Sequence, residues 1–410
     1  MSTTAQSDSS SAVKSLKHPR IHIGIFAPLY LDSAFDEFNV FRYADQFPRF
    51  AVPGFEFVEG CKMAVSALAK EGIIPEITVV DTRSWFFKNE MDAKTGVHTT
   101  INEGDSMQAI NRSYDETGIA NLKQRIDSMQ VIICMEKDNE FMRLAKFAQK
   151  KNAVFLSAVY PNHGGILQYP KFFMFNSSIK THVEFMLSEA IKKNNAQLLV
   201  VSRKDKQDER IVSYIKAKKN SNIKFLNLDT SFILSQHLDS TKKNIIIGAS
   251  FNEAFAFTLS DSLNKVKNKK YELSFWGMPN WDGFRAASTN GQKMYPFLYT
   301  AAYYNEKKDS ICTQINNNYL SKYMGNPGDY VYKGYEIMML ASRLNPLAES
   351  QEIALQMNEN DTKLFSQLQF EETKINDKSS TPDFYENKHL FILKKTGKNI
   401  QKWQEPAAKK

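Results

Sequence analysis

The segment QVIICMEKDNEFMRLAKFAQKKNAVFLSAVY, residues 130–160, decides the fold class of this 410-residue chain. Two continuous apolar runs, at residues 130–135 and 153–160, flank residues 138–152, whose apolar side chains recur at helical spacing. Apolar runs without alternation are typical of parallel strands that are buried on both faces. A helix between two such strands makes a strand–helix–strand unit, so the segment predicts an α/β fold.

The same alternation extends from residue 21 to about residue 306. Its nine apolar, β-rich runs occupy residues 21–30, 76–82, 130–135, 153–160, 172–178, 197–202, 223–229, 244–250 and 271–277. The runs form two sets, one before and one after residue 179. Because each set repeats the strand–helix pattern, we predict two Rossmann-like lobes with parallel sheets rather than one wide sheet.

The end of the chain returns to β structure after a stretch of helices. Two β-rich runs, residues 363–372 and 386–403, close the chain, and Gly397 lies in a predicted hairpin turn. We expect residues 1–18 to be a disordered lead, residues 19–178 with 296–345 to form lobe 1, and residues 179–295 with 346–410 to form lobe 2.

Composition describes an ordinary globular protein and excludes several kinds of site. The net charge is +8, but the lysines are spread over helix ends and loops, with no stripe that mixes basic and aromatic residues. We therefore expect no nucleic-acid partner. The three cysteines have neither metal-ligand nor disulfide spacing, so we expect no metal site and no cofactor.

The first 18 residues are polar and Ser-rich, without an apolar stretch that could act as a signal or an anchor. No later stretch has the length and apolar character of a membrane span, so we expect no membrane insertion. Two locations stay open. The protein is cytoplasmic if Met1 is the native start, and it belongs to the periplasm or cell envelope if a signal segment precedes it.

The motifs of common α/β enzymes are missing from the sequence. It contains no G-x-G-x-x-G after the first strand, no phosphate-binding P-loop and no G-x-S-x-G elbow, and its histidines lack metal spacing. We therefore expect no catalytic residues and no enzymatic activity. A two-lobed α/β enzyme, such as a glycosyl-transfer or nucleotide-using protein, is kept as an alternative.

Candidate ligand-binding residues follow from the rule that ligands bind beyond the C-terminal ends of parallel strands. The rule selects polar and aromatic residues that come directly after the predicted strands. They are Tyr30, Glu136, Ser157, Tyr160, Asn162, His163, Arg203, Ser250, Trp276 and Trp281.

Three of these groups have two interpretations each. The YPNHGG loop at residues 160–165 either presents polar groups to a cleft or is a plain turn. The stretch WGMPNWDGF at residues 276–284 is either a stacking platform for a sugar or aromatic ligand or a hydrophobic latch within one lobe. Arg203 either clamps an anion or belongs to a solvated loop with Lys204, Asp205 and Asp208.

Four stretches of the sequence resemble the type I periplasmic-binding proteins, the group of the leucine/isoleucine/valine-binding proteins. They are IHIGIFAPLYLDS (21–33), GFEFVEGCKMAVSALAKEGI (54–73), FAQKKNAVFLSAVY (147–160) and FYENKHLFILKKTGKNIQKW (384–403). The second has the F-x-x-G-x-x-x-A pattern of the family's first helix. The resemblance covers nearly the whole chain from residue 21 and is closest to diverged members of Bacteroidetes-type bacteria.

The resemblance implies a fold and a function. Three crossovers, near residues 177–179, 292–296 and 344–346, would join the lobes, and a small molecule of unidentified kind would lie in the cleft between them. The chain would then resemble the substrate-binding component of an amino-acid-type ABC transporter, with a membrane transporter or another envelope protein as its partner. It departs from the family at MEKDN (135–139), where acidic residues would repel an amino-acid carboxylate.

This departure leaves a second function open. A binding-protein fold that has lost its ligand can serve protein–protein interaction in the cell envelope. That alternative predicts a filled cleft and an exposed apolar or aromatic patch on residues 31–53 or 83–117.

Overall fold

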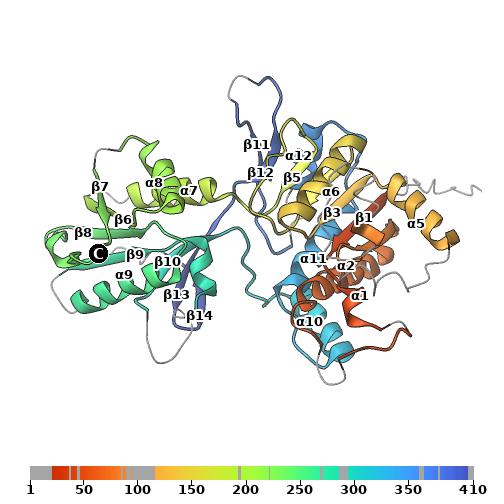
Figure 1. Ribbon diagram of the computed structural model, residues 1–410, viewed down its shortest axis with the longest axis horizontal. Helices are drawn as coiled ribbons and strands as arrows, with labels where there is room; N and C mark the ends of the chain where they lie inside the picture. Colours follow the sequence, from red (N-terminus) through yellow and green to blue (C-terminus); the bar gives the residue numbers. More distant parts are fainter. Residues whose placement is uncertain are drawn as a thin grey trace, which may run out of the picture.

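The computed structural model describes residues 21–36, 38–43, 47–84, 86–88, 94, 116–192, 195–220, 222–267, 271–285, 294–359, 364–376 and 379–404. The described strands form two seven-stranded, mostly parallel sheets, and each sheet lies in its own lobe (Figure 1). Helices cover the sheets in both lobes. The prediction of a two-lobed α/β fold is confirmed.

Lobe 1 is built around a sheet with the order β11-β12-β5-β4-β3-β1-β2. Its strands are β1 (His22–Ala27), β2 (Glu76–Asp81), β3 (Val131–Cys134), β4 (Val154–Ser157), β5 (Phe172–Met174), β11 (Phe370–Thr373) and β12 (Phe384–Asn387). Its helices are α1 (Leu31–Ala34), α2 (Val52–Lys70), α5 (Glu116–Ser128), α6 (Asp138–Lys151), α10 (Ser310–Tyr323), α11 (Asp329–Ala341) and α12 (Ser350–Asn358).

The apolar runs of lobe 1 are buried on both faces, as their composition predicts. In β3, Val131 and Ile133 pack in the core that contains α2, α10, α11 and α12, whereas Ile132 and Cys134 pack with α6 on the other face. A strand that alternates between two apolar cores has no polar face, which is why its sequence reads as one continuous apolar run.

Lobe 2 has the sheet order β14-β13-β10-β9-β8-β6-β7. Its strands are β6 (Ala196–Ser202), β7 (Ile223–Asn227), β8 (Lys243–Gly248), β9 (Glu272–Trp276), β10 (Phe297–Ala301), β13 (Phe391–Thr396) and β14 (Asn399–Lys402). Its helical elements are α7 (Ile179–Ile191), α8 (Lys206–Lys216), α9 (Glu253–Val266) and the 3-10 turns η1 (Leu234–Gln236) and η2 (Pro279–Gly283). Gly397 has φ +59° in the β13–β14 hairpin, where the turn is predicted.

The described strands divide between the lobes at residues other than the predicted boundaries. β10 lies in lobe 2, beside β9, whereas β11 and β12 lie in lobe 1, where Tyr385 pairs with Phe173 of β5. The segments that connect the lobes are crossover 1 (residues 175–178), crossover 2 (302–309) and crossover 3 (388–390). The last blue segment of the chain therefore contributes strands to both lobes (Figure 1).

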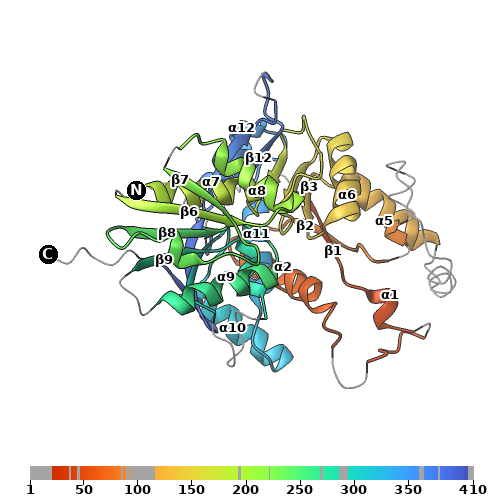
Figure 2. The ribbon, with the colours of Figure 1, turned by 60° about the vertical axis from the view of Figure 1, so that its left-hand side comes forward.

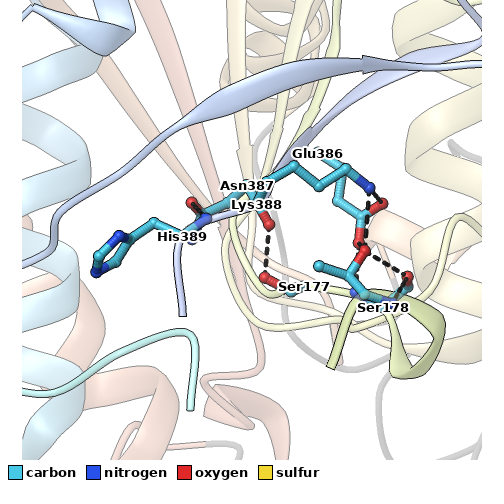
Figure 3. A network of polar contacts seen from close by, with 7 residues as sticks. Ser177, Ser178, Glu386, Asn387, Lys388 and His389 are labelled. Carbon is cyan, nitrogen blue, oxygen red and sulfur yellow. Dashed lines mark hydrogen bonds and ion pairs between the residues drawn. The ribbon is translucent and has the colours of Figure 1, made fainter. Parts of the chain in front are cut away.

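Crossover 1 and the end of β12, where crossover 3 begins, are joined by a buried polar network (Figure 3). The Glu386 carboxylate, 2% exposed, accepts hydrogen bonds from the Ser178 amide and the Thr181 hydroxyl, both at 2.7 Å, and it also pairs with the Lys388 ammonium. The Ser177 hydroxyl donates to the Asn387 carbonyl at 2.6 Å. These bonds hold crossover 1 and the start of α7 to the end of β12, where crossover 3 begins.

Helices α2 and α11 lie side by side, and two glycines permit their close approach (Figure 1 and Figure 2). A Cβ at Gly60 would lie 2.0 Å from the Val331 carbonyl oxygen, and a Cβ at Gly334 would lie 2.1 Å from the Phe57 carbonyl oxygen. A side chain at either position would push the helices apart. Gly60 is the glycine of the F-x-x-G-x-x-x-A pattern, so the structure gives that pattern a packing reason.

Candidate functional site

The C-terminal edge of the lobe 1 sheet begins at the loop after β1, which Asp81 holds in place. The Asp81 carboxylate accepts hydrogen bonds from the amides of Leu29, Tyr30 and Leu31 at 2.8–3.2 Å. Burial raises the pKa of Asp81, and these amide bonds act in the opposite direction. The loop places Tyr30 in the left-handed region, with φ 56°, and its half-buried ring lies against Phe50 and Arg83.

Glu136, which follows β3, is neutralised within lobe 1. Its buried carboxylate pairs with the Arg83 guanidinium at 2.7 Å and accepts a hydrogen bond from Thr82, and the same guanidinium lies 3.6 Å from Glu140. Burial raises the pKa of Glu136, and the Arg83 charge counteracts this. The expected repulsion of an anionic ligand by this turn is therefore offset by an arginine from the end of β2.

The predicted polar cluster after β4 makes hydrogen bonds to nearby residues of its own lobe. The Tyr160 hydroxyl donates to Asp138 at 3.2 Å, whereas Asn162 and His163 accept hydrogen bonds from the amides of Gly164 and Gly165. Both glycines have positive φ, so the YPNHGG loop has the geometry of a plain turn. The His163 ring also stacks on Phe384, and burial lowers its pKa. The fully buried Ser157 hydroxyl has no hydrogen-bond partner among the described residues.

The lobe 2 candidates do not form a binding surface. Trp276 and Trp281 are buried in the lobe 2 core, at 2% and 0% exposure, and the Trp281 indole donates to the Ser250 carbonyl at 2.8 Å. Cβ atoms at Gly248 or Gly277 would lie within 2.4 Å of the Trp281 ring, so both glycines make room for it. The interpretation of residues 276–284 as a stacking platform is wrong, and the stretch is the hydrophobic latch within one lobe.

Ser250 and Arg203 are likewise engaged inside lobe 2. Ser250 is fully buried, and its hydroxyl accepts a hydrogen bond from the Asn252 amide at 3.2 Å, at the start of α9. The Arg203 amide and its Nε both donate to Asp208 Oδ2 at 3.1 Å. Arg203 therefore holds the start of α8. Lys204 and Asp205 of this loop are exposed, but Asp208 is fully buried, so the predicted solvated loop is solvated only in part.

A small pocket lies at the ends of β4 and β5, beside crossover 2. It is lined by Ala158, Phe175, Asn176, Ala302, Tyr303, Lys333, Glu336, Ile337, Ser366 and Leu368. Its free space is about 30 Å³, on the order of one water molecule. None of the lining residues is among the ten predicted site residues. Helix α11, which contributes Lys333, Glu336 and Ile337, was not considered in that prediction.

Lys333 is the cation of this pocket. Its ammonium lies 4.7 Å from the centre of the Tyr303 ring and 5.6 Å from that of Tyr330. Burial lowers the pKa of Lys333, and the neighbouring carboxylates Asp329 and Asp282 act in the opposite direction. The signal in the sequence is a lysine inside DYVYKGYEIMMLA, a helix that is otherwise almost entirely apolar or aromatic.

Asp282 of lobe 2 contributes to the electrostatic field around Lys333. Asp282 lies in η2, and burial raises its pKa. The positive charges that counteract this increase most are those of Lys395 and then Lys333. Lys395 of β13 is itself only 4% exposed. Lys333 of lobe 1 and Asp282 of lobe 2 thus interact electrostatically. Ala302 and Tyr303 of crossover 2 also line the pocket, so it lies on the side of lobe 1 where the chain crosses to lobe 2.

Two further kinds of site were tested over the described ranges. No three His, Cys, Asp or Glu side chains come together there in an arrangement that could hold a metal ion. No helix of the described ranges combines the length and the apolar character that a membrane crossing requires.

Comparison with known proteins identifies similar proteins by structure alone. No protein-family model and no curated protein matches the sequence. A protein from Rhodospirillum rubrum, provisionally assigned as a branched-chain amino acid ABC transporter, is 11% identical at TM-score 0.57, over 94% of this chain and all of that one. A branched-chain amino acid ABC-type transporter protein from Rhodopseudomonas palustris is 10% identical at TM-score 0.53, over 94% of this chain and 96% of that one.

A third structure contains a ligand. An ABC transporter substrate-binding protein from Desulfitobacterium hafniense, in complex with Leu, is 13% identical at TM-score 0.52, over 94% of this chain and 100% of that one. At these identities the likeness concerns the fold, and it extends over both lobes.

Proposed function

We propose that this chain, which has the fold of the type I periplasmic binding proteins, is a non-enzymatic protein that binds a small molecule between its two lobes. The observation that carries the proposal is the pocket at the ends of β4 and β5. It lies where parallel strands end, next to a crossover, and it contains a cation that has no ion-pair partner among the described residues.

The related structures support this class of function. The protein from Desulfitobacterium hafniense is a transporter substrate-binding protein with bound leucine. By analogy, a membrane transporter is the proposed recipient of the ligand, and hinge closure of the lobes is the proposed motion. Tyr30 and Tyr160 are half-buried at the same edge of lobe 1 and remain proposed contacts of the ligand, together with Asn176 and Tyr303 of the pocket.

A ligand screen with a shape readout tests the proposal. Purified protein is screened by thermal shift against amino acids, carboxylic acids, sugars, nucleosides and short peptides, and each hit is measured by calorimetry. Small-angle scattering then compares the radius of gyration with and without the hit. We expect one ligand class to raise the melting temperature and to make the protein more compact. A screen without a hit would contradict the proposal.

A second candidate function is protein–protein interaction, which one observation favours. Apolar side chains with 36–78% exposure gather on the segment after β1, and we call them the aromatic surface: Leu31, Phe38, Val40, Tyr43, Phe47 and Phe50. Ring contacts at about 6 Å link Tyr43 with Phe50 and Phe41 with Phe47. Exposed apolar patches of this kind are typical of interaction sites.

A matched pair of variants separates the two candidates. Phe38→Ser with Phe47→Ser removes two exposed rings of the aromatic surface, whereas Leu347→Ser removes a single exposed side chain elsewhere in lobe 1, at 79% exposure. If interaction is the function, a partner purified with the wild type is lost from the first variant alone. If the screen finds a ligand and both variants keep the same partners, this second candidate is wrong.

A further inference from the structure

We propose that a groove beside crossover 2 is a second binding site of this protein, and that its ligand is an uncharged saccharide. The groove lies between crossover 2, the segment before β11 and the β13–β14 hairpin, and we call it the hinge groove. This inference goes beyond the proposed function and does not depend on it, because the hinge groove is separate from the pocket at the ends of β4 and β5.

The hinge groove is much larger than the pocket that contains Lys333. Its free space is about 290 Å³, against about 30 Å³ for the pocket, and it is close to the lower limit of about 300 Å³ for typical small-molecule sites. Lobe 1 contributes Phe365 and Gln367 to its wall, and lobe 2 contributes Phe391 and Lys402. A ligand held there would contact both lobes and the segment that connects them.

The hinge groove and the pocket lie on opposite sides of the segment before β11. Phe365 and Gln367 line the groove, whereas Ser366 and Leu368 line the pocket. Successive side chains of an extended chain point to opposite sides, which explains this alternation. The hinge groove is therefore a distinct site that shares a wall with the pocket, and it is not an extension of the pocket.

The charges of the hinge groove favour neither an anion nor a cation. Two carboxylates, Glu306 and Asp309, stand against two ammonium groups, Lys308 and Lys402, among the described residues of its wall. Glu306 pairs with Lys308 at 3.0 Å, and Asp309 accepts a hydrogen bond from the Cys312 amide at 2.7 Å. An ion of either sign would meet as much repulsion as attraction here, so an uncharged ligand fits best.

Aromatic rings and free hydrogen-bonding groups favour a saccharide among uncharged ligands. The rings of Tyr304 and Phe391 are tilted by 58° with centres 6.0 Å apart, so they do not form a parallel slot for a planar base. One ring face is enough to pack against the C–H face of a sugar. The Tyr304 hydroxyl and the Gln367 side-chain amide make no hydrogen bond to another described residue, and both can donate to and accept from sugar hydroxyls.

The test measures sugar binding to the full chain. Glucose, N-acetylglucosamine and maltotriose are titrated by calorimetry and by saturation-transfer NMR, beside sorbitol, an open-chain polyol without a ring. We expect at least one sugar to bind about 10-fold more tightly than sorbitol and to slow amide exchange at residues 304–309 and 364–367. Tighter binding of maltotriose than of glucose would identify the ligand as a glycan chain, and equal binding would identify it as a free monosaccharide.

Variants locate the bound sugar. Tyr304→Ala and Gln367→Ala should each weaken binding by about 5- to 10-fold, whereas Gln207→Ala, which removes an exposed glutamine of α8, should leave it unchanged. Gln367 is itself exposed, so Gln367→Ala carries the test if Tyr304→Ala misfolds.

Two results would overturn the inference. If no sugar binds, or if sorbitol binds equally well, the hinge groove is not a saccharide site, and the proposed function is still decided by its own screen. If a sugar binds with full affinity to both groove variants, it lies outside the hinge groove, which refutes this inference and leaves the proposed function intact.

Discussion

Acid should destabilise lobe 2 through a single buried histidine, and we expect the effect to disappear in His182→Gln. His182 of α7 is 5% exposed, and its Nδ1 lies 2.8 Å from the Thr300 hydroxyl of β10. Burial lowers the pKa of His182 from 6.5 to about 4. The pair joins the start of lobe 2 after crossover 1 to the strand that leads into crossover 2.

The sign and size of this pH effect on the unfolding free energy follow from proton linkage. Between pH 6.5 and pH 4 the unfolded chain carries a proton on His182 that the folded chain excludes, so acid favours unfolding in this window. With these two pKa values, lowering the pH from 7 to 5 costs about 2 kcal/mol of unfolding free energy. For a domain of this size, that corresponds to a shift of about 1 M in the urea midpoint.

Tryptophan fluorescence is a suitable assay, because Trp276, Trp281 and Trp403 all pack in lobe 2. Urea unfolding is followed at pH 7 and pH 5 for the wild type and for His182→Gln, whose amide can still reach Thr300. We expect the wild type to lose about 1 M in midpoint and the variant to lose much less. His22 and His163, whose pKa values burial also lowers, lie in lobe 1 and are the same in both proteins, so the difference between the wild type and the variant isolates His182. Equal losses in the two proteins would refute the reasoning.

Three other perturbations have calculable outcomes. Glu386→Gln should destabilise the protein by about 3 kcal/mol at pH 7, since it breaks a buried ion pair, and by less near pH 4. Burial raises the pKa of Glu386, but Lys388 and the hydrogen bonds outweigh burial and lower this pKa, so the stabilisation by Glu386 is present above pH 4.5 and is lost as the pH falls. Urea midpoints of both proteins at pH 7 and pH 4 check this. Gly334→Ala should lower the melting temperature by the equivalent of about 3 kcal/mol, whereas Gly283→Ala, with nothing within 4 Å, should change it little; equal effects would contradict the close-approach argument. Glu336→Ala should accelerate amide exchange at residues 364–366, which lose their acceptor, and unchanged exchange by mass spectrometry would show that Glu336 does not hold this segment.

Local sequence patterns predict the strands and helices well, because each buried strand is a continuous apolar run. They do not predict which sheet a late strand joins. β11 and β12 follow the lobe 1 helices closely; β11 pairs with β12, and the pairing of β12 with β5 connects residues about 200 positions apart. Such pairing depends on the completed sheet edge, which no local pattern encodes.

The candidate site was less predictable than the fold, for the same physical reason. Trp281 fits a ligand platform and a core latch equally well in sequence, and only the space beside Gly248 and Gly277 decides for the core. Glu136 reads as an unpaired charge, because its partner Arg83 lies 53 positions earlier. Lys333 was missed, although a charged side chain in an apolar helix is itself a signal that can be read from sequence.

The Glu386 network has a mechanical consequence. It holds crossover 1 to the end of β12, where crossover 3 begins, whereas crossover 2 lies outside that network. We expect any rotation of the lobes to occur about an axis through this contact, so that crossover 2 would move the most. Tyr303 belongs to crossover 2, whereas Lys333 belongs to α11, which packs closely against α2 within lobe 1. Any opening or closing of the lobes would therefore change the distance between the Tyr303 ring and the Lys333 ammonium, which is 4.7 Å in this structure.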